Sequence, residues 1–110
     1  MATTSDIDGE PFAEQTALTK LLGDHPKVKI MVVLLSESRD INVSQIAKQA
    51  GMSRSTVYNH IDDLLELNVV EKTRELGGSP LYQLNRDSDV AKKVGQLEWE
   101  LLDEFEVDEE

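Results

Sequence analysis

Hydrogen-bonding and cationic side chains gather between residues 53 and 59 of this 110-residue chain, which read SRSTVYN. Within two helical turns, such side chains are suited to base edges and phosphates. Asp62, Asp63 and Glu66 lie further along and would be repelled by phosphate. We therefore place the recognition chemistry at residues 53–59, ahead of these acids. The candidate DNA-contact residues are Ser53, Arg54, Ser55, Tyr58 and Asn59.

Two short amphipathic helices within Asn42 to Val70 are expected to position these side chains. Asn42 can cap the first helix with Gln45 as its capping-box partner, and Gly51 can end that helix in the left-handed conformation. Ser53 starts the second helix. Its inward-facing residues recur at i, i+4 and i+7, which are Val57, Ile61 and Leu64. This arrangement predicts a helix-turn-helix.

A β-hairpin is expected next, with strands at Val69 to Leu76 and Leu81 to Asn85 and a reversal at Gly77 to Pro80. Asn68 is expected to end the second helix in the left-handed region. Ile41 can add a strand of one or two residues beside this sheet. In the first strand of the hairpin, Lys72 and Arg74 are two residues apart and are expected on one face. They are candidate phosphate or minor-groove contacts, and ordinary solvated strand charges are the alternative.

Two helices are expected before this unit. The first starts at Pro11 and ends at Gly23, and Asp24 or His25 caps the second, with Pro26 at its first position. The apolar run Ile30 to Leu35 fits a buried strand or a buried helix equally well by periodicity. The proline start and the lysines at 27 and 29 favour the helix.

A last helix is expected from a cap at Asp87 or Ser88 to about Phe105. Its apolar residues follow a spacing of four, three and four, which is typical of a helix-helix contact, and Trp99 lies off this stripe. We expect a homodimer through this helix and the first one. The alternative is that the helix folds back onto its own domain. The predicted interface residues are Leu18, Leu21, Val90, Val94, Leu97, Leu101 and Phe105.

Three segments together resemble winged helix-turn-helix transcription regulators of the broad ArsR/MarR type: LLGDHPKVKIMVVLL, IAKQAGMSRSTVYNHIDDLLELNVVEK and the glycine-bearing hairpin before LYQL. The resemblance covers roughly residues 18 to 85. It implies a mainly α fold with a small β-hairpin wing, and a sequence-specific DNA-binding homodimer. By resemblance, residues 53–59 supply recognition-helix contacts, and Lys72, Arg74 and the tip residues Gly78 and Ser79 belong to the wing. Asn68 stands where the family commonly has glycine.

The expected organisation is a disordered acidic N-terminus (1–10), a winged helix-turn-helix domain (11–86), a dimerisation helix (87–106) and an acidic tail (107–110). The absence of cysteine excludes disulfides and thiolate metal sites. His25 and His60 are most simply structural, and no metal, cofactor or catalytic residue is expected. We therefore expect no enzyme. The competing hypothesis is a winged-helix protein-interaction module without direct DNA binding.

The net charge of −11 is unevenly distributed. Residues 1–14 and 95–110 together carry twelve acids and no cation, which leaves residues 15–94 at +1. Such acidic composition resembles proteins of salt-loving cytoplasms, and we expect a halophilic archaeal source. No secretory signal or membrane span is visible, so we expect a cytosolic protein. A small-molecule effector is possible, but no residue pattern indicates one.

Overall fold

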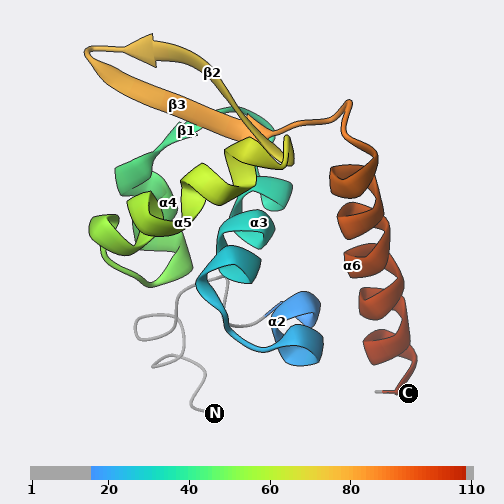
Figure 1. Ribbon diagram of the computed structural model, residues 1–110. Coiled ribbons are helices and arrows are strands. Elements are labelled where there is room, and N and C mark those ends of the chain that lie inside the picture. Colours follow the sequence, from blue (N-terminus) through green and yellow to red (C-terminus); the bar gives the residue numbers. More distant parts are fainter. Residues whose placement is uncertain (1–15, 109–110) are drawn as a thin grey trace.

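The computed structural model describes residues 16–108, with side chains through residue 104. It contains five helices in this range: α2 (Ala17–Leu22), α3 (Pro26–Ser36), α4 (Val43–Ala50), α5 (Arg54–Glu66) and α6 (Asp89–Asp108). The strands β1 (Ile41–Asn42), β2 (Val70–Leu76) and β3 (Ser79–Leu84) form an antiparallel sheet in the order β1-β3-β2. The β2–β3 hairpin projects above the helices, and α6 runs along one side (Figure 1). This is the predicted winged helix-turn-helix fold.

Several predicted boundaries shift or fall outside this range. Residues 1–10 and the predicted helix start at Pro11 lie outside the described residues. The part of the predicted first helix that the structure describes is α2, which ends at Leu22 before Gly23. The last helix continues to Asp108, beyond the predicted end near Phe105. The expected β1 strand is present, because Ile41 pairs with Tyr82 of β3.

Helix α3 lies at the centre of the core. Ile30, Val33 and Leu34 are almost completely buried, and α3 contacts α2, α4, α5 and β3. The apolar run is therefore a helix, as the proline start indicated. His25 caps it, since its Nδ1 accepts a hydrogen bond from the Lys27 backbone N–H at 3.1 Å.

Local signals for the helix-turn-helix are confirmed. Asn42 and Gln45 form the capping box at the start of α4, with the two side chain-to-backbone bonds at 2.8 and 3.0 Å. Gly51 ends α4 at φ 73°, in the left-handed region that glycine adopts without strain. Asn68 has φ 62° after α5, and the N–H groups of residues 68 and 69 satisfy carbonyls in the last turn. Asn42 and Gly51 thus define the two ends of α4, and Asn68 defines the end of α5.

Helix α6 is attached to its own domain by part of its apolar stripe. Ser88 caps it by accepting a bond from the Ala91 N–H at 3.1 Å, and Ala91 is buried in the main core. Glu98 accepts a hydrogen bond from the Leu18 N–H at 2.9 Å, so α6 satisfies a donor at the start of α2. A second apolar cluster joins α2, α3 and α6 through Leu18, Val28, Val32, Leu35, Val94 and Leu101.

Replacing Asn42 with Ala should lower the free energy of unfolding by about 1 kcal/mol, because the start of α4 loses its side-chain cap. Asn42→Asp keeps the acceptor and should retain most of the stability. Urea unfolding followed by circular dichroism measures both. Equal midpoints for the wild type and Asn42→Ala would show that the capping box does not stabilise the fold.

Candidate nucleic-acid interface

The first two turns of α5 present a polar, exposed surface. Ser53, Arg54, Ser55, Tyr58 and Asn59 are all exposed, while Val57, Ile61 and Leu64 are buried against the domain. Tyr58 is 52% exposed, which leaves its ring and hydroxyl accessible from solvent. Ser53 also has a structural role, because its hydroxyl oxygen accepts a bond from the Thr56 N–H at 3.1 Å and caps α5.

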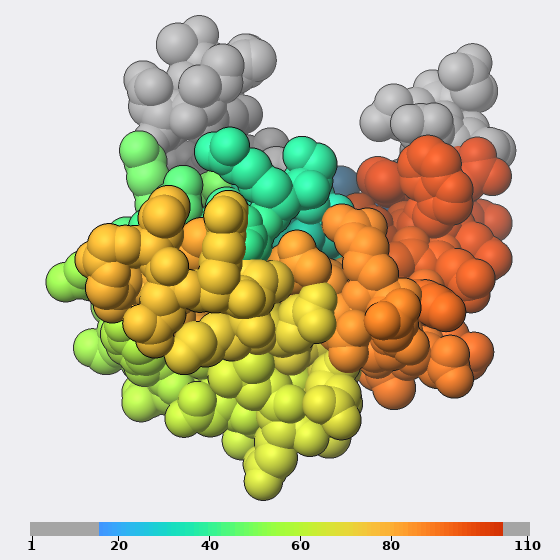
Figure 2. All heavy atoms as spheres, turned by 90° about the horizontal axis from the view of Figure 1, so that it is seen from above, coloured from blue at the N-terminus to red at the C-terminus, as the bar shows by residue number. Residues whose placement is uncertain are grey.

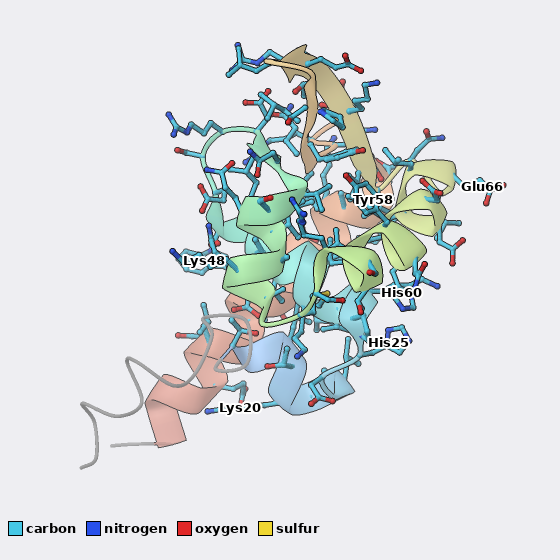
Figure 3. All side chains as sticks on the ribbon, turned by 90° about the vertical axis from the view of Figure 1, so that its left-hand side faces the viewer. Lys20, His25, Lys48, Tyr58, His60 and Glu66 are labelled. Atoms are coloured by element: carbon cyan, nitrogen blue, oxygen red, sulfur yellow. The ribbon has the colours of Figure 1, made fainter. Side chains whose placement is uncertain are left out.

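Arg54 and Tyr58 lie beside the wing. A small hollow of about 60 Å³ is lined by residues of β1, α4, α5 and β3, namely Asn42, Val43, Ser44, Arg54, Tyr58, Ser79 and Pro80. The Arg54 guanidinium donates to the Ser44 hydroxyl at 3.3 Å. Figure 3 shows Tyr58 on the part of α5 below the hairpin. The structure thus brings Ser79 of the wing tip next to the recognition helix, and it adds Ser44, which the sequence did not single out.

The wing reverses through a two-residue turn. Leu76 pairs with Ser79, and Gly77 and Gly78 have φ of 57° and 82°. Two consecutive positive φ values are typical of a type I′ turn, whose twist matches that of the strands. Ser79 and Pro80 therefore belong to β3, whereas the sequence placed them in the reversal. In Figure 2, the hairpin (gold to orange) lies over the body beside α5 (yellow-green), with α6 (red) to one side.

The prediction that Lys72 and Arg74 share one face of β2 is wrong. Lys72 pairs with Tyr82 and Arg74 pairs with Leu81, so Thr73 is an extra residue in a β-bulge. Since Tyr82 and Leu81 are neighbours in β3, they point to opposite faces. Lys72 therefore lies on the face of buried Tyr82, and Arg74 lies on the other face.

The two wing cations also have different partners. Lys72 forms an exposed ion pair with Glu75 of the same strand, at 3.1 Å. Arg74 pairs with Asp40, which precedes β1, and its Nε–Oδ2 distance is 3.1 Å. The Arg74 guanidinium, with help from the Thr73 hydroxyl, lowers the pKa of the Asp40 carboxyl, and Asp40 in turn raises the pKa of Arg74. Sequence reasoning missed Asp40 because its partners lie more than thirty residues away.

The far half of α5 is acidic and is attached to α3. Asp63 forms an ion pair with Lys27 at 2.7 Å, and a hydrogen bond from Lys27 lowers the pKa of Asp63.

The rings of His25 and His60 meet edge to face with centroids 5.4 Å apart (Figure 3). Burial raises the pKa of Tyr82. Among residues 16–108, no group of three or more His, Cys, Asp or Glu side chains is placed to hold a metal ion.

The candidate dimer residues fall into two groups. Leu18, Val94 and Leu101 belong to the second apolar cluster within the chain. Leu21, Val90 and Leu97 are exposed, as are Leu22, Leu102 and Trp99, the last at 74%. The Phe105 side chain lies outside the described part.

No helix within the described residues is both long and apolar enough to cross a membrane.

The capped helix pair, the exposed polar start of α5 and the adjoining hairpin define a winged helix-turn-helix protein. Residues 25–72 match the family model described as "Bacterial regulatory protein, arsR family". The match runs from the cap of α3 into the first residues of β2, and it supports a winged-helix regulator of transcription that binds DNA. The match supports the ArsR part of the resemblance and does not support the MarR part. No curated protein and no solved structure matches the chain.

Replacing Gly78 with Ala should destabilise the wing by about 1 kcal/mol, because a side chain at φ 82° strains the backbone although space around it is open. Gly77→Asn is the matched control, since asparagine is favoured at the first central position of a type I′ turn. Amide hydrogen exchange across residues 70–84 measures the opening of the hairpin. Equal exchange in both variants would contradict this account of the turn.

Proposed function

We propose that this protein is a sequence-specific DNA-binding transcription regulator that acts as a homodimer. Each recognition helix α5 enters a major groove, and the wing contacts the flanking backbone or minor groove. The two-fold axis of the dimer spaces the half-sites about one helical turn apart. The observation that carries the proposal is the exposed polar start of α5 beside the wing, within the stretch that matches the arsR family.

The charge along α5 supports one direction of approach to DNA. Arg54 lies at its beginning, and Asp62, Asp63 and Glu66 lie in its second half. Phosphates near that second half would be repelled, so the duplex backbone has to pass closer to the start of the helix. Arg54, Ser55, Tyr58 and Asn59 are then the side chains that reach base edges and phosphates, with Ser53 fixing the backbone there.

The exposed apolar residues of α2 and α6 support the homodimer. These two helices contact each other, and both leave leucines exposed: Leu21 and Leu22 at 53%, and Leu97 at 40%. Trp99 and Leu102 also line a surface hollow of about 380 Å³ on α6. A surface of this kind is typical of a protein-protein contact. Val90, Leu97 and Leu21 are therefore available between copies, while Leu18, Val94 and Leu101 support α6 from within.

The acidic composition supports a halophilic archaeal source and a salt-rich cytoplasm as part of the same proposal. At molar salt, counterion release contributes little to DNA affinity, so specificity rests on base contacts and on DNA shape. Circular dichroism in increasing KCl tests this proposal. Folding that is complete without added salt and does not change up to molar KCl would count against it.

Arg54→Ala and Asn59→Ala should each weaken binding to the cognate site by about 1–3 kcal/mol and relax sequence preference, because each removes a base or phosphate contact. Genome-wide occupancy of the tagged protein identifies the site, and fluorescence anisotropy then gives the affinities. The exposed carboxylate of Glu66, further along α5, supplies the control variant Glu66→Ala, which should bind at least as well as the wild type.

Unchanged affinity in both variants would contradict the recognition-helix assignment. No occupancy peaks, together with a stable protein partner that co-purifies, would favour the protein-interaction module.

Leu97→Asp should convert the dimer to monomers and weaken DNA binding through lost bivalency, because it places a charge in an apolar contact. Gln96→Asp adds the same charge at the exposed neighbouring position and should remain dimeric. Size-exclusion chromatography with light scattering measures the mass. A dimeric Leu97→Asp variant would exclude this face of α6 as the main interface.

A further inference from the structure

Asp40 connects the outer strand of the wing to the helix-turn-helix. It lies directly before β1, and its carboxylate accepts hydrogen bonds from the Thr73 hydroxyl and the Arg74 guanidinium of β2. Strand β3 lies between β1 and β2 in the sheet, so these contacts cross over β3 at Leu81. The Asp40 side chain is 11% exposed, whereas Arg74 is 61% exposed.

The bulge at Thr73 makes this contact possible. Without the extra residue, Arg74 would share the face of Lys72 and Tyr82. With it, Arg74 shares the face of Leu81 and Asn42, on the side of the sheet where Asp40 lies. The Thr73 hydroxyl, which has a single proton, lies within hydrogen-bond reach of both the Asp40 carboxylate and the Leu81 carbonyl, the latter at 3.3 Å. The irregularity in β2 thus directs two consecutive side chains to one carboxylate.

The carboxylate holds Arg74 by one edge of its guanidinium. Nε donates to Oδ2 at 3.1 Å and Nη2 donates to Oδ1 at 3.3 Å. The guanidinium is a planar fork with five N–H donors, so a carboxylate on the Nε/Nη2 edge leaves the Nη1 edge directed away from it. The Arg74 side chain is mostly exposed, and its Nη1 edge has the geometry for a phosphate oxygen.

We propose that Asp40 is a positioning residue that holds the Arg74 guanidinium so that its outer edge receives a phosphate of bound DNA. This inference rests on the proposed DNA-binding function and assigns a residue to it. An arginine on a projecting wing loses side-chain freedom when it binds, and a neighbouring carboxylate that orients it beforehand reduces that loss. Asp40 itself does not touch the DNA.

The proposal predicts an effect opposite to that of charge alone. Removing a carboxylate near DNA should strengthen binding if the carboxylate merely repels phosphate or competes for Arg74. If Asp40 positions Arg74, its removal should weaken binding. The sign of the change therefore separates positioning from repulsion.

The experiment is a double-mutant cycle of Asp40→Ala and Arg74→Ala in the full chain. The probe is a labelled duplex of roughly 30 bp selected from a random pool by the wild-type protein, long enough for two half-sites. Because the dimer makes the contact in both half-sites, each single variant should lose roughly a hundredfold in affinity, the scale of two charge-assisted hydrogen bonds. The double variant should lose no more than Arg74→Ala. The slope of log affinity against log salt should fall by about two in all three variants, one for each half-site of the dimer.

Two controls separate positioning from damage to the wing. Thr73→Val removes the other hydrogen bond to Asp40 and should keep the wild-type affinity and salt slope. Asp40→Asn retains one acceptor oxygen and should lose less than Asp40→Ala. Thermal unfolding monitors whether each variant is folded, and the NMR signal of the Arg74 Nε–H reports the pair without DNA. That signal should shift in Asp40→Ala and stay unchanged in Thr73→Val.

Several results would overturn the proposal. They are stronger binding by Asp40→Ala, a further loss when Asp40→Ala is added to Arg74→Ala, or an unchanged Arg74 Nε–H signal. Binding by the wild type with no effect of Arg74→Ala would refute this inference and leave the proposed function intact. Failure of the wild type to select any duplex would refute the proposed function, and this inference with it.

Discussion

The burial of α3 on two opposite faces is the constraint on which the rest of the structure depends. Ile30, Val33 and Leu34 are buried on one face of the helix, and Val28 and Val32 are buried on the opposite face, so α3 needs neighbours on both sides. Helices α4 and α5, strand β3 and helix α2 supply them. Since α4 and α5 both pack against α3 as well as against each other, the angle between them is fixed from two directions. The exposed start of α5 is thereby held rigidly outside the core, as a recognition surface requires.

The chain separates the structural contacts of α5 from its proposed recognition surface. Its apolar residues and the Asp63–Lys27 pair attach it to α3, while the polar side chains of its first two turns are exposed. At the same end, the wing contributes Ser79 and Pro80 beside Arg54 and Tyr58. A surface built from residues 42–44, the start of α5 and the wing thus lies on one side of the domain, and its geometry depends on the hairpin as much as on the helix.

Much of this arrangement could be predicted because its signals are local. The caps at Asn42, Ser53 and Ser88 and the left-handed Asn68 follow from residue type and from neighbours within a few positions. The bulge at Thr73 could not be predicted, because residues 71–75 are all polar and exposed or half-buried, so no apolar alternation marks the register, and the irregularity shows only in the pairing with β3. The division of the α6 stripe, with Val94 inward and Leu97 outward, likewise depends on where α2 lies.

The cap of α3 determines the tautomer of its N-cap residue, His25. His25 accepts the Lys27 N–H through Nδ1, so that nitrogen must carry a lone pair and the neutral ring must carry its proton on Nε2. The tautomer of this imidazole is therefore fixed by the backbone of the central helix. The ring nitrogen that accepts from the backbone leaves only a donor at the other nitrogen, so any further partner of the His25 ring at Nε2 has to be an acceptor.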